Sequence, residues 1–191
     1  MLNFLLPLLR NAAVVEPGSV ACPAWSFEVA HTHISFSGRH LGFARTPGIF
    51  RRFDAQLAFD DEHIEASRAY FEIDAASIDT AIDLRDEHLR GTDWLHVHAH
   101  PKIAFVSHSV RLLDGRQYAI DGDLTIRGIT LPALFDATLI DRAVNPWTRH
   151  PVVGFEATAS VSRSAYGMDA ILHALSDDVR LKIATEIRRE P

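Results

Sequence analysis

The feature that most constrains the fold is a run of alternating apolar and polar residues over positions 117–127. The large apolar members fall on even positions, and they are Tyr118, Ile120, Leu124 and Ile126. Because successive side chains on a strand point to opposite faces, this pattern predicts a strand with one dry face and one wet face. Gly122 falls on the dry face, where a missing side chain permits a bend or a close approach by another group.

A second alternating run follows directly, so the two runs predict a β-hairpin. Gly128 supplies the turn, and the apolar positions beyond it are Ala133, Phe135, Ala137 and Leu139. Shorter or less regular runs of the same kind predict further strands near residues 25–40, 49–60, 63–74, 101–113, 153–162 and 179–188. The segment 41–48, with two glycines and a proline, is expected to be a loop or corner.

Two segments have helical rather than alternating periodicity. Residues 83–90 predict a short helix that ends at Gly91. The i, i+3, i+4, i+7 spacing of Met168, Ile171, Leu172 and Leu175 predicts a second short helix with one apolar stripe. Many strands without a βαβ rhythm indicate an all-β fold, either a sandwich or a barrel. About eight antiparallel strands are expected, and closure into a barrel would remove the exposed strand edges.

The composition is that of a globular domain without a nucleic-acid partner. The chain has 191 residues, enough for one domain with a core, and its net charge of −6 offers no basic excess for phosphates. Cys22 is the only cysteine, so the fold cannot depend on an intrachain disulfide.

Residues 1–22 form an N-terminal extension before a predicted domain at 23–191. The apolar run at 2–9 contains Pro7, is too short to cross a membrane, and has Arg10 after it rather than basic residues before it. The extension is therefore either an atypical export signal or lipid anchor that ends near Cys22, or a segment that packs on the domain. The lack of a convincing signal favours a cytoplasmic location.

Several short motifs occur in a fixed order along the chain. They are Trp25 with His31-Thr32, Gly48-Ile49-Phe50, Arg85-Asp86-Glu87-His88-Leu89, Pro101 with Ile103 and Phe105, Gly122 to Gly128, and Arg163-Ser164. Together they resemble the YceI-like family of bacterial lipid-binding proteins over about residues 25–186. The resemblance implies a lipocalin-like barrel, a homodimer and an apolar lumen that holds a polyisoprenoid chain or quinone tail. It also implies storage, transport or stress protection in the periplasm or outside the cell, as an alternative to the cytoplasm.

The predicted ligand-binding residues are one histidine and the large apolar side chains on the dry strand faces. Small residues such as Ala55, Ala133 and Gly122 occur among them, which favours a tunnel, although alanines also suit the narrow end of a packed barrel. The residues are Phe36, His40, Phe53, Leu57, Phe59, Ile103, Phe105, Leu124, Ile126, Phe135, Phe155, Leu181 and Ile183. The polar mouth is assigned to His31, Thr32, His40 and Arg85.

The sequence contains no recognisable catalytic motif, so we predict a binding protein with a bound lipid rather than an enzyme with a cofactor. The alternative is a metal-binding protein or metal-dependent enzyme that uses His96, His98 and His100. These imidazoles would share one face of an extended strand, and three imidazoles can form a zinc site. A third interpretation is an interaction module with a filled core.

Overall fold

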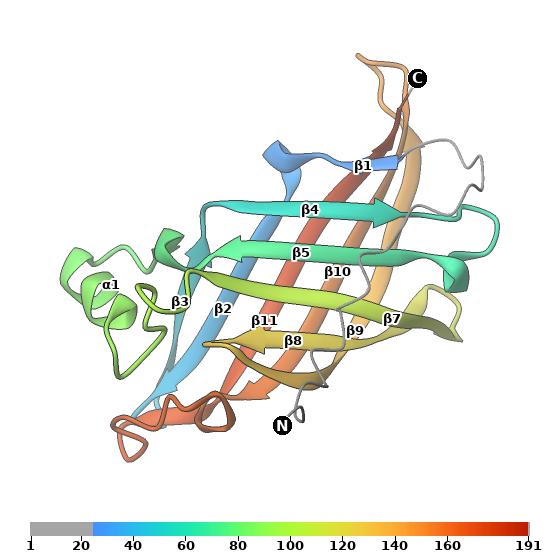
Figure 1. The fold of residues 1–191 in the computed structure, drawn as a ribbon. Coiled ribbons are helices and arrows are strands. Elements are labelled where there is room, and N and C mark those ends of the chain that lie inside the picture. The colour runs from blue at the N-terminus through green and yellow to red at the C-terminus, as the bar shows by residue number, and fades with distance from the viewer. Residues whose placement is uncertain (1–24, 191) are drawn as a thin grey trace, which may run out of the picture.

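The structure is a computed structural model that describes residues 25–190, and Figure 1 shows its fold. Its strands are Trp25–Phe27 (β1), His33–His40 (β2), Ala44–Phe50 (β3), Phe53–Ala58 (β4), Arg68–Asp74 (β5), Ile78–Asp79 (β6), Lys102–Asp114 (β7), Gln117–Ile126 (β8), Ile129–Val144 (β9), Pro151–Ser162 (β10) and Leu175–Arg189 (β11). The helices are α1 (Asp83–Arg90) and four short 3₁₀ turns, Val29–His31, Ile64–Ala66, Ala75–Ser77 and Ser164–Tyr166. The N-terminal extension predicted at 1–22 lies outside the described residues.

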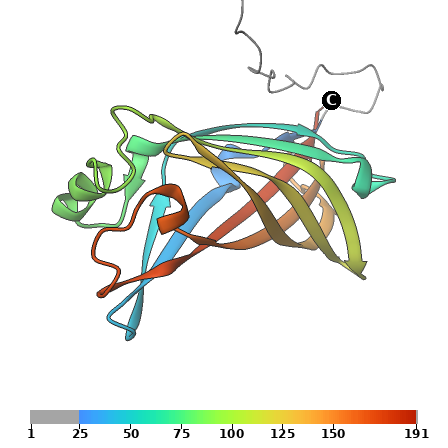
Figure 2. The same ribbon diagram turned by 60° about the horizontal axis from the view of Figure 1, so that its bottom comes forward.

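All the strands belong to one antiparallel sheet, which confirms the predicted all-β class. The strand order is β4-β5-β7-β8-β9-β10-β11-β2-β3-β6, and β1 pairs with β11 beside this path. Figure 2 shows the sheet curling around an interior, with α1 and the segment 163–175 at the same end. The sheet has eleven strands rather than the predicted eight.

Two of the three extra strands come from the region before residue 60, and the third is β6, which no predicted strand covered. The predicted strand at 25–40 is divided by the 3₁₀ turn Val29–His31, and the predicted strand at 49–60 is divided between β3 and β4. The segment 41–48, expected to be a loop, supplies most of β3. Pro47 fits this strand because β6 pairs only with Ile49 and Phe50, so no neighbour on that side requires the missing N–H at Pro47.

The central hairpin forms as predicted. Strands β8 and β9 pair without a register shift from Gln117–Thr138 to Ile126–Ile129. The two turn residues, Arg127 and Gly128, both have positive φ, +52° and +73°. Positive φ at both positions is the requirement of a type I′ turn, whose twist matches that of the flanking strands.

One of the two predicted helices is correct. Helix α1 spans Asp83–Arg90 and ends at Gly91, as expected. The helix predicted at 168–175 is wrong, because these residues form turns before β11, and Ile171 and Leu172 are 45% and 44% exposed. The Arg163 guanidinium accounts for this, since it donates to the Met168 carbonyl that a helix would use internally.

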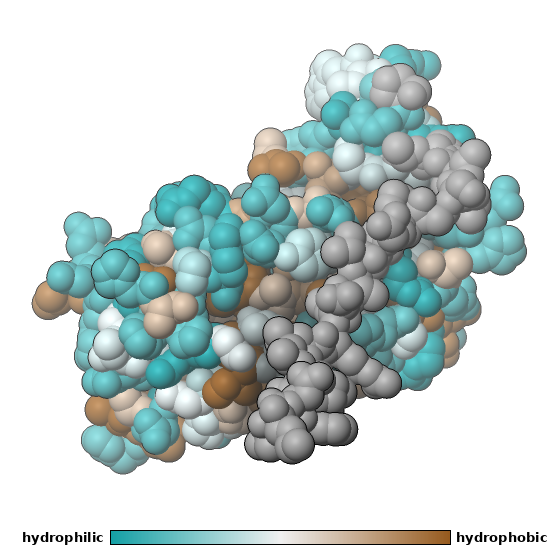
Figure 3. Space-filling view, viewed as in Figure 1, coloured by the Kyte–Doolittle hydropathy of each residue, from teal (hydrophilic) through white to brown (hydrophobic). Residues whose placement is uncertain are grey.

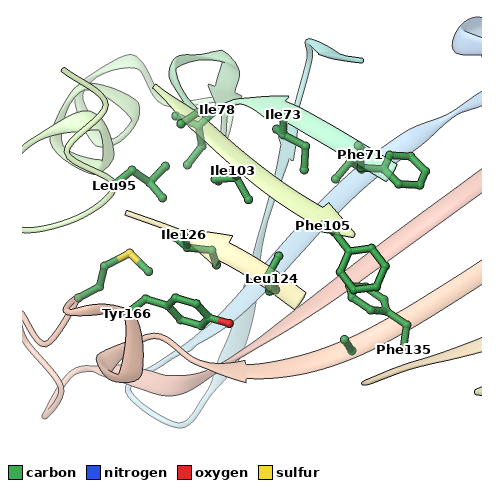
Figure 4. Close-up of a cluster of buried hydrophobic side chains, with 14 residues drawn as sticks. Phe71, Ile73, Ile78, Leu95, Ile103, Phe105, Leu124, Ile126, Phe135 and Tyr166 are labelled. Carbon is green, nitrogen blue, oxygen red and sulfur yellow. The ribbon is translucent and has the colours of Figure 1, made fainter. Parts of the chain in front are cut away.

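The core consists of two apolar clusters inside the curled sheet. The larger lies toward α1, and Figure 4 shows how its side chains converge from β5, β7, β8 and β9. The smaller surrounds Trp25, Phe59 and Ile187.

Within residues 25–190, no helix is long and apolar enough to cross a membrane. The face seen in Figure 3 is mostly hydrophilic, with separate hydrophobic areas, so the apolar face of the sheet is turned inward.

Candidate ligand-binding cavity

The interior of the sheet contains a cavity of about 490 Å³ at the α1 end. Its walls come from β2, β5, β7, β8 and β11, and it is bordered by α1, the loop after α1 and the segment 163–175. Ligand pockets in proteins are commonly about 300–1,000 Å³ and mainly apolar. The volume and the apolar walls therefore suit a hydrophobic small molecule.

Nine of the thirteen predicted ligand-binding residues line this cavity. They are Phe36, His40, Ile103, Phe105, Leu124, Ile126, Phe135, Leu181 and Ile183. They come from β2, β7, β8, β9 and β11, and all the apolar ones point inward because the dry face of each strand faces the interior. The alternation of apolar and polar residues therefore predicted correctly which face of each strand is turned toward the interior. It carries no information about how much space remains between the facing side chains.

The other four predicted residues lie elsewhere. Leu57, Phe59 and Phe155 line a second cavity of about 110 Å³, toward the opposite end. Phe53 lines neither cavity, and its ring packs against Phe71 at a centroid distance of 6.4 Å.

The predicted mouth residues divide in the same way. His40 and Arg85 line the large cavity, whereas His31 and Thr32 do not. His31 is exposed and faces Glu186, with Nδ1 and Oε2 3.0 Å apart. Thr32 is buried and donates to the Glu28 carbonyl at 2.8 Å. The polar mouth of the cavity therefore lies at the α1 end and not beside His31.

Two glycines allow aromatic rings to lie against the cavity wall. A Cβ at Gly122 would lie 2.6 Å from Cζ of Phe105 and would also contact the Val106 carbonyl. A Cβ at Gly48 would contact the Phe36 ring, with Cε1 at 2.6 Å. Both distances are far below van der Waals contact, so any side chain at these positions would displace a lining ring. The close approach predicted at Gly122 is therefore the approach of Phe105.

The polar side chains at the α1 end are basic or neutral. Among the described residues that line the cavity, none is an aspartate or glutamate, although the whole chain has a net charge of −6. Arg85 donates from Nε to Thr80 Oγ1 at 2.7 Å and from Nη2 to the Thr80 carbonyl at 2.6 Å. Thr80 is held in turn by the buried Asp86 carboxylate, which accepts from the Thr80 backbone N–H at 2.9 Å. This network fixes the Arg85 guanidinium at the cavity wall.

Arg163 is the second fixed cation at this end, and its side chain is only 4% exposed. Its guanidinium donates to the carbonyls of Leu175 and Ser176 at 3.0 Å each and to that of Met168. The guanidinium carbon also lies 4.9 Å from the centre of the Trp94 ring, a cation–π distance. Burial lowers the pKa of Arg163 from its usual value, since the charged form is removed from water.

Sequence reasoning missed the lining residues that come from loops, including Trp94, Leu95 and Met168. Trp94 and Leu95 belong to no alternating run, and Met168 belongs to the apolar stripe that predicted a helix rather than a cavity wall. Arg163 was recognised only as part of a motif, and its contacts with backbone carbonyls leave no local sequence signal.

The proposed three-histidine metal site is not formed. Residues 96–100 make a tight turn, in which His96 has φ +48° and its carbonyl accepts from the N–H groups of Ala99 and His100. An extended strand was needed to align the three rings, so the premise of the metal alternative is wrong. Across residues 25–190, no group of three histidine, cysteine, aspartate or glutamate side chains is arranged to hold a metal ion.

Comparison with known proteins agrees with this architecture. The model of the YceI-like domain matches residues 25–187. A UPF0312 protein of Pectobacterium atrosepticum is 35% identical over 184 residues, which are 95% of each chain.

Two solved structures share the fold. The crystal structure of Burkholderia cenocepacia BcnA has a TM-score of 0.77 and 23% identity, and the match covers 84% of this chain and 99% of that one. A polyisoprenoid binding domain from Saccharophagus degradans, implicated in plant cell wall breakdown, has a TM-score of 0.61 and 11% identity, with coverage of 88% and 100%.

Proposed function

Because this chain belongs to the YceI-like domain family, we propose that it binds a long-chain polyisoprenoid, or a similar amphiphilic lipid such as a quinone, inside its curled sheet. The single observation that carries the proposal is the cavity of about 490 Å³, with its mainly apolar strand walls and with Arg85, His88 and Arg163 at one end. The fold shared with the polyisoprenoid binding domain of Saccharophagus degradans supports the same ligand class.

Hydrocarbon burial alone is sufficient to drive such binding. Each apolar carbon group removed from water contributes about 0.8 kcal/mol. Association costs about 4–15 kcal/mol before the ordering of side chains is added, so ten such groups, about 8 kcal/mol, offset the lower part of this range and about twenty offset its upper end. A polyisoprenoid tail supplies five carbons per unit, so about two to four units reach this range without any charged contact.

The distribution of polar residues indicates how the ligand is oriented. Arg85, His88 and Arg163 border the cavity at the α1 end, whereas most of the lining residues on the strands are apolar, with Ser35 and Lys182 among the exceptions. A head group with oxygen acceptors would therefore lie at the α1 end, with the tail directed along the strands. A lipid held in this way is shielded from water, which is a common requirement of storage, transport and protection.

The proposal is tested by native mass spectrometry of gently purified full-length protein. We expect a mass excess that corresponds to one lipid, and tandem mass spectrometry of an organic extract should identify an isoprenoid chain. The matched variants are Leu124→Trp and Thr125→Trp, which place the same bulk on opposite faces of β8. Leu124 is buried and lines the cavity, so its replacement should abolish the mass excess.

Thr125 lies on the other face of β8, where its hydroxyl contacts Thr130 Oγ1 at 2.8 Å. The Thr125→Trp protein should therefore retain the lipid. Equal lipid content in the two variants would place the lipid outside the cavity, and the absence of lipid together with no uptake of added polyisoprenoid would refute the proposed function.

A further inference from the structure

We propose that Phe105 and Phe135 form an aromatic partition between the two interior cavities, and that this partition determines which tail lengths the protein prefers. The inference rests on the proposed function and extends it to chain-length selection. It starts from the linings of the two cavities, which have four residues in common: Phe71, Phe105, Phe135 and Ile183. These four side chains therefore stand between a cavity of about 490 Å³ and one of about 110 Å³.

The two phenylalanines make direct contact across the interior. Phe105 comes from β7 and Phe135 from β9, and their ring centroids are 4.8 Å apart at an interplanar angle of 62°. They are 7% and 4% exposed, and Figure 4 shows the two rings side by side beyond Leu124. This edge-to-face geometry is a favourable aromatic arrangement. The pair is thus ordered in the absence of a ligand.

The strand between them explains why the rings meet there. Strand β8 lies between β7 and β9 in the sheet, and Gly122 on β8 pairs with Ser107 on one side and Ala133 on the other. Because Gly122 has no Cβ, the Phe105 ring can lie over the β8 backbone. The partition is therefore built at the one position of this strand that lacks a side chain.

The second cavity is suited to the end of a tail and not to a head group. The hydroxyls of Ser67 and Ser107, which contribute to its lining, already accept hydrogen bonds from the backbone N–H groups of Asp60 and Ala69, at 3.0 and 2.8 Å. The remaining walls include Leu57, Phe59, Val110, Tyr118, Phe155 and Ile187. Hydrocarbon entering this space would gain burial without displacing any hydrogen bond.

A partition of this kind imposes a threshold on tail length. The attraction within one aromatic pair is smaller than the gain from burying one five-carbon unit. A tail that only fills the large cavity ends against the rings and leaves them paired. A longer tail must separate the rings before its end reaches the second cavity. The free energy needed to separate them offsets part of the free energy gained by burying the added unit.

The test uses delipidated full-length protein and a homologous series of quinones that differ only in the number of isoprenoid units. Dissociation constants are measured by isothermal titration calorimetry at a fixed detergent concentration. For the wild type, affinity should rise with tail length, show a shallow plateau in which the unit that must separate the rings adds less than the others, and rise again for tails that reach the second cavity. In Phe135→Ala the plateau should disappear, and binding of the longest tails should tighten on the order of tenfold.

Leu139→Ala is the matched control, because Leu139 is similarly buried but lines neither cavity. It should keep the plateau. Phe135→Leu, which preserves an apolar core residue while removing the ring, provides a second variant if Phe135→Ala does not fold. A plateau that is unchanged in both Phe135 variants would overturn the partition while leaving the proposed function intact. Failure of the wild type to bind any quinone would overturn both.

Discussion

At the scale of single residues, Arg163 is the most constrained side chain at the cavity. It is a buried cation whose donors go to three backbone carbonyls rather than to a carboxylate. Its hydrogen bonds hold the segment 163–175 in the turn conformation that borders the cavity, and they do so in place of the predicted helix. The residue therefore links the local structure of this segment to the shape of the cavity.

Replacing Arg163 with methionine should destabilise the protein by about 3 kcal/mol, because three buried or partly buried carbonyls lose a charged donor. The free energy of unfolding, measured with urea, tests this. Arg111→Met is the control, since Arg111 pairs with Asp121 at 3.1 Å and both side chains are about half exposed. An exposed pair contributes at most about 1 kcal/mol. Similar losses in the two variants would show that Arg163 is not a structural anchor.

At the scale of elements, Asp177 joins the end of β10 to the 3₁₀ turn Ser164–Tyr166. Its Oδ2 accepts from Ser162 Oγ at 2.6 Å, and its Oδ1 accepts from the Ser164 backbone N–H at 2.8 Å. The hydroxyl of Ser162, followed by the Ser164 N–H, lowers the pKa of Asp177 by donating to its charged form.

This lowered pKa predicts an acid-dependent contribution to stability. A carboxyl group whose pKa is lower in the folded state stabilises it fully above the unfolded value, about 3.9, and loses this contribution as the pH falls through the folded value. The difference in unfolding free energy between wild type and Asp177→Asn should therefore be constant above about pH 6 and shrink below about pH 4. Denaturation series across this range would measure it, and a difference that does not vary with pH would contradict the assignment.

The elements also show what the sequence can and cannot predict. Strands β7 to β11 have long alternating runs, because each has one face in the interior along most of its length, and they were located correctly. The short strands β1 to β4 were merged or missed, since a turn of three residues barely disturbs an apolar pattern. At 168–175 a helical spacing was present, but the long-range contacts of Arg163 determine the conformation, and no local pattern encodes them.

At the scale of the whole molecule, a hollow interior links stability to ligand binding. The cavity of about 490 Å³ offers apolar surface against which a ligand can pack. A ligand that binds only the folded state stabilises it by about 2.7 kcal/mol at one hundred times its dissociation constant. For a domain of this size the melting temperature should therefore rise by about 5–11 °C.

Thermal unfolding of delipidated protein with a long-tailed quinone measures this effect. A quinone with the same head group and no tail is the control, and it should leave the melting temperature unchanged. An equal shift with both compounds would assign the stabilisation to the head group, contrary to the expectation from the apolar walls. The face of each strand that is turned inward was predictable from the alternating sequence pattern. The volume of the cavity was not, because the volume depends on how tightly the sheet curls.

The positions of the three tryptophans have a practical consequence. Trp94 borders the large cavity, Trp25 packs edge-to-face against Phe59 of the small one at 5.2 Å, and Trp147 is 87% exposed at the tip between β9 and β10. The three indoles therefore have different surroundings. A quinone head group at the α1 end would quench the fluorescence of Trp94, while Trp25 and Trp147 would serve as internal references. The protein thus carries an intrinsic fluorescent reporter of where the head group lies.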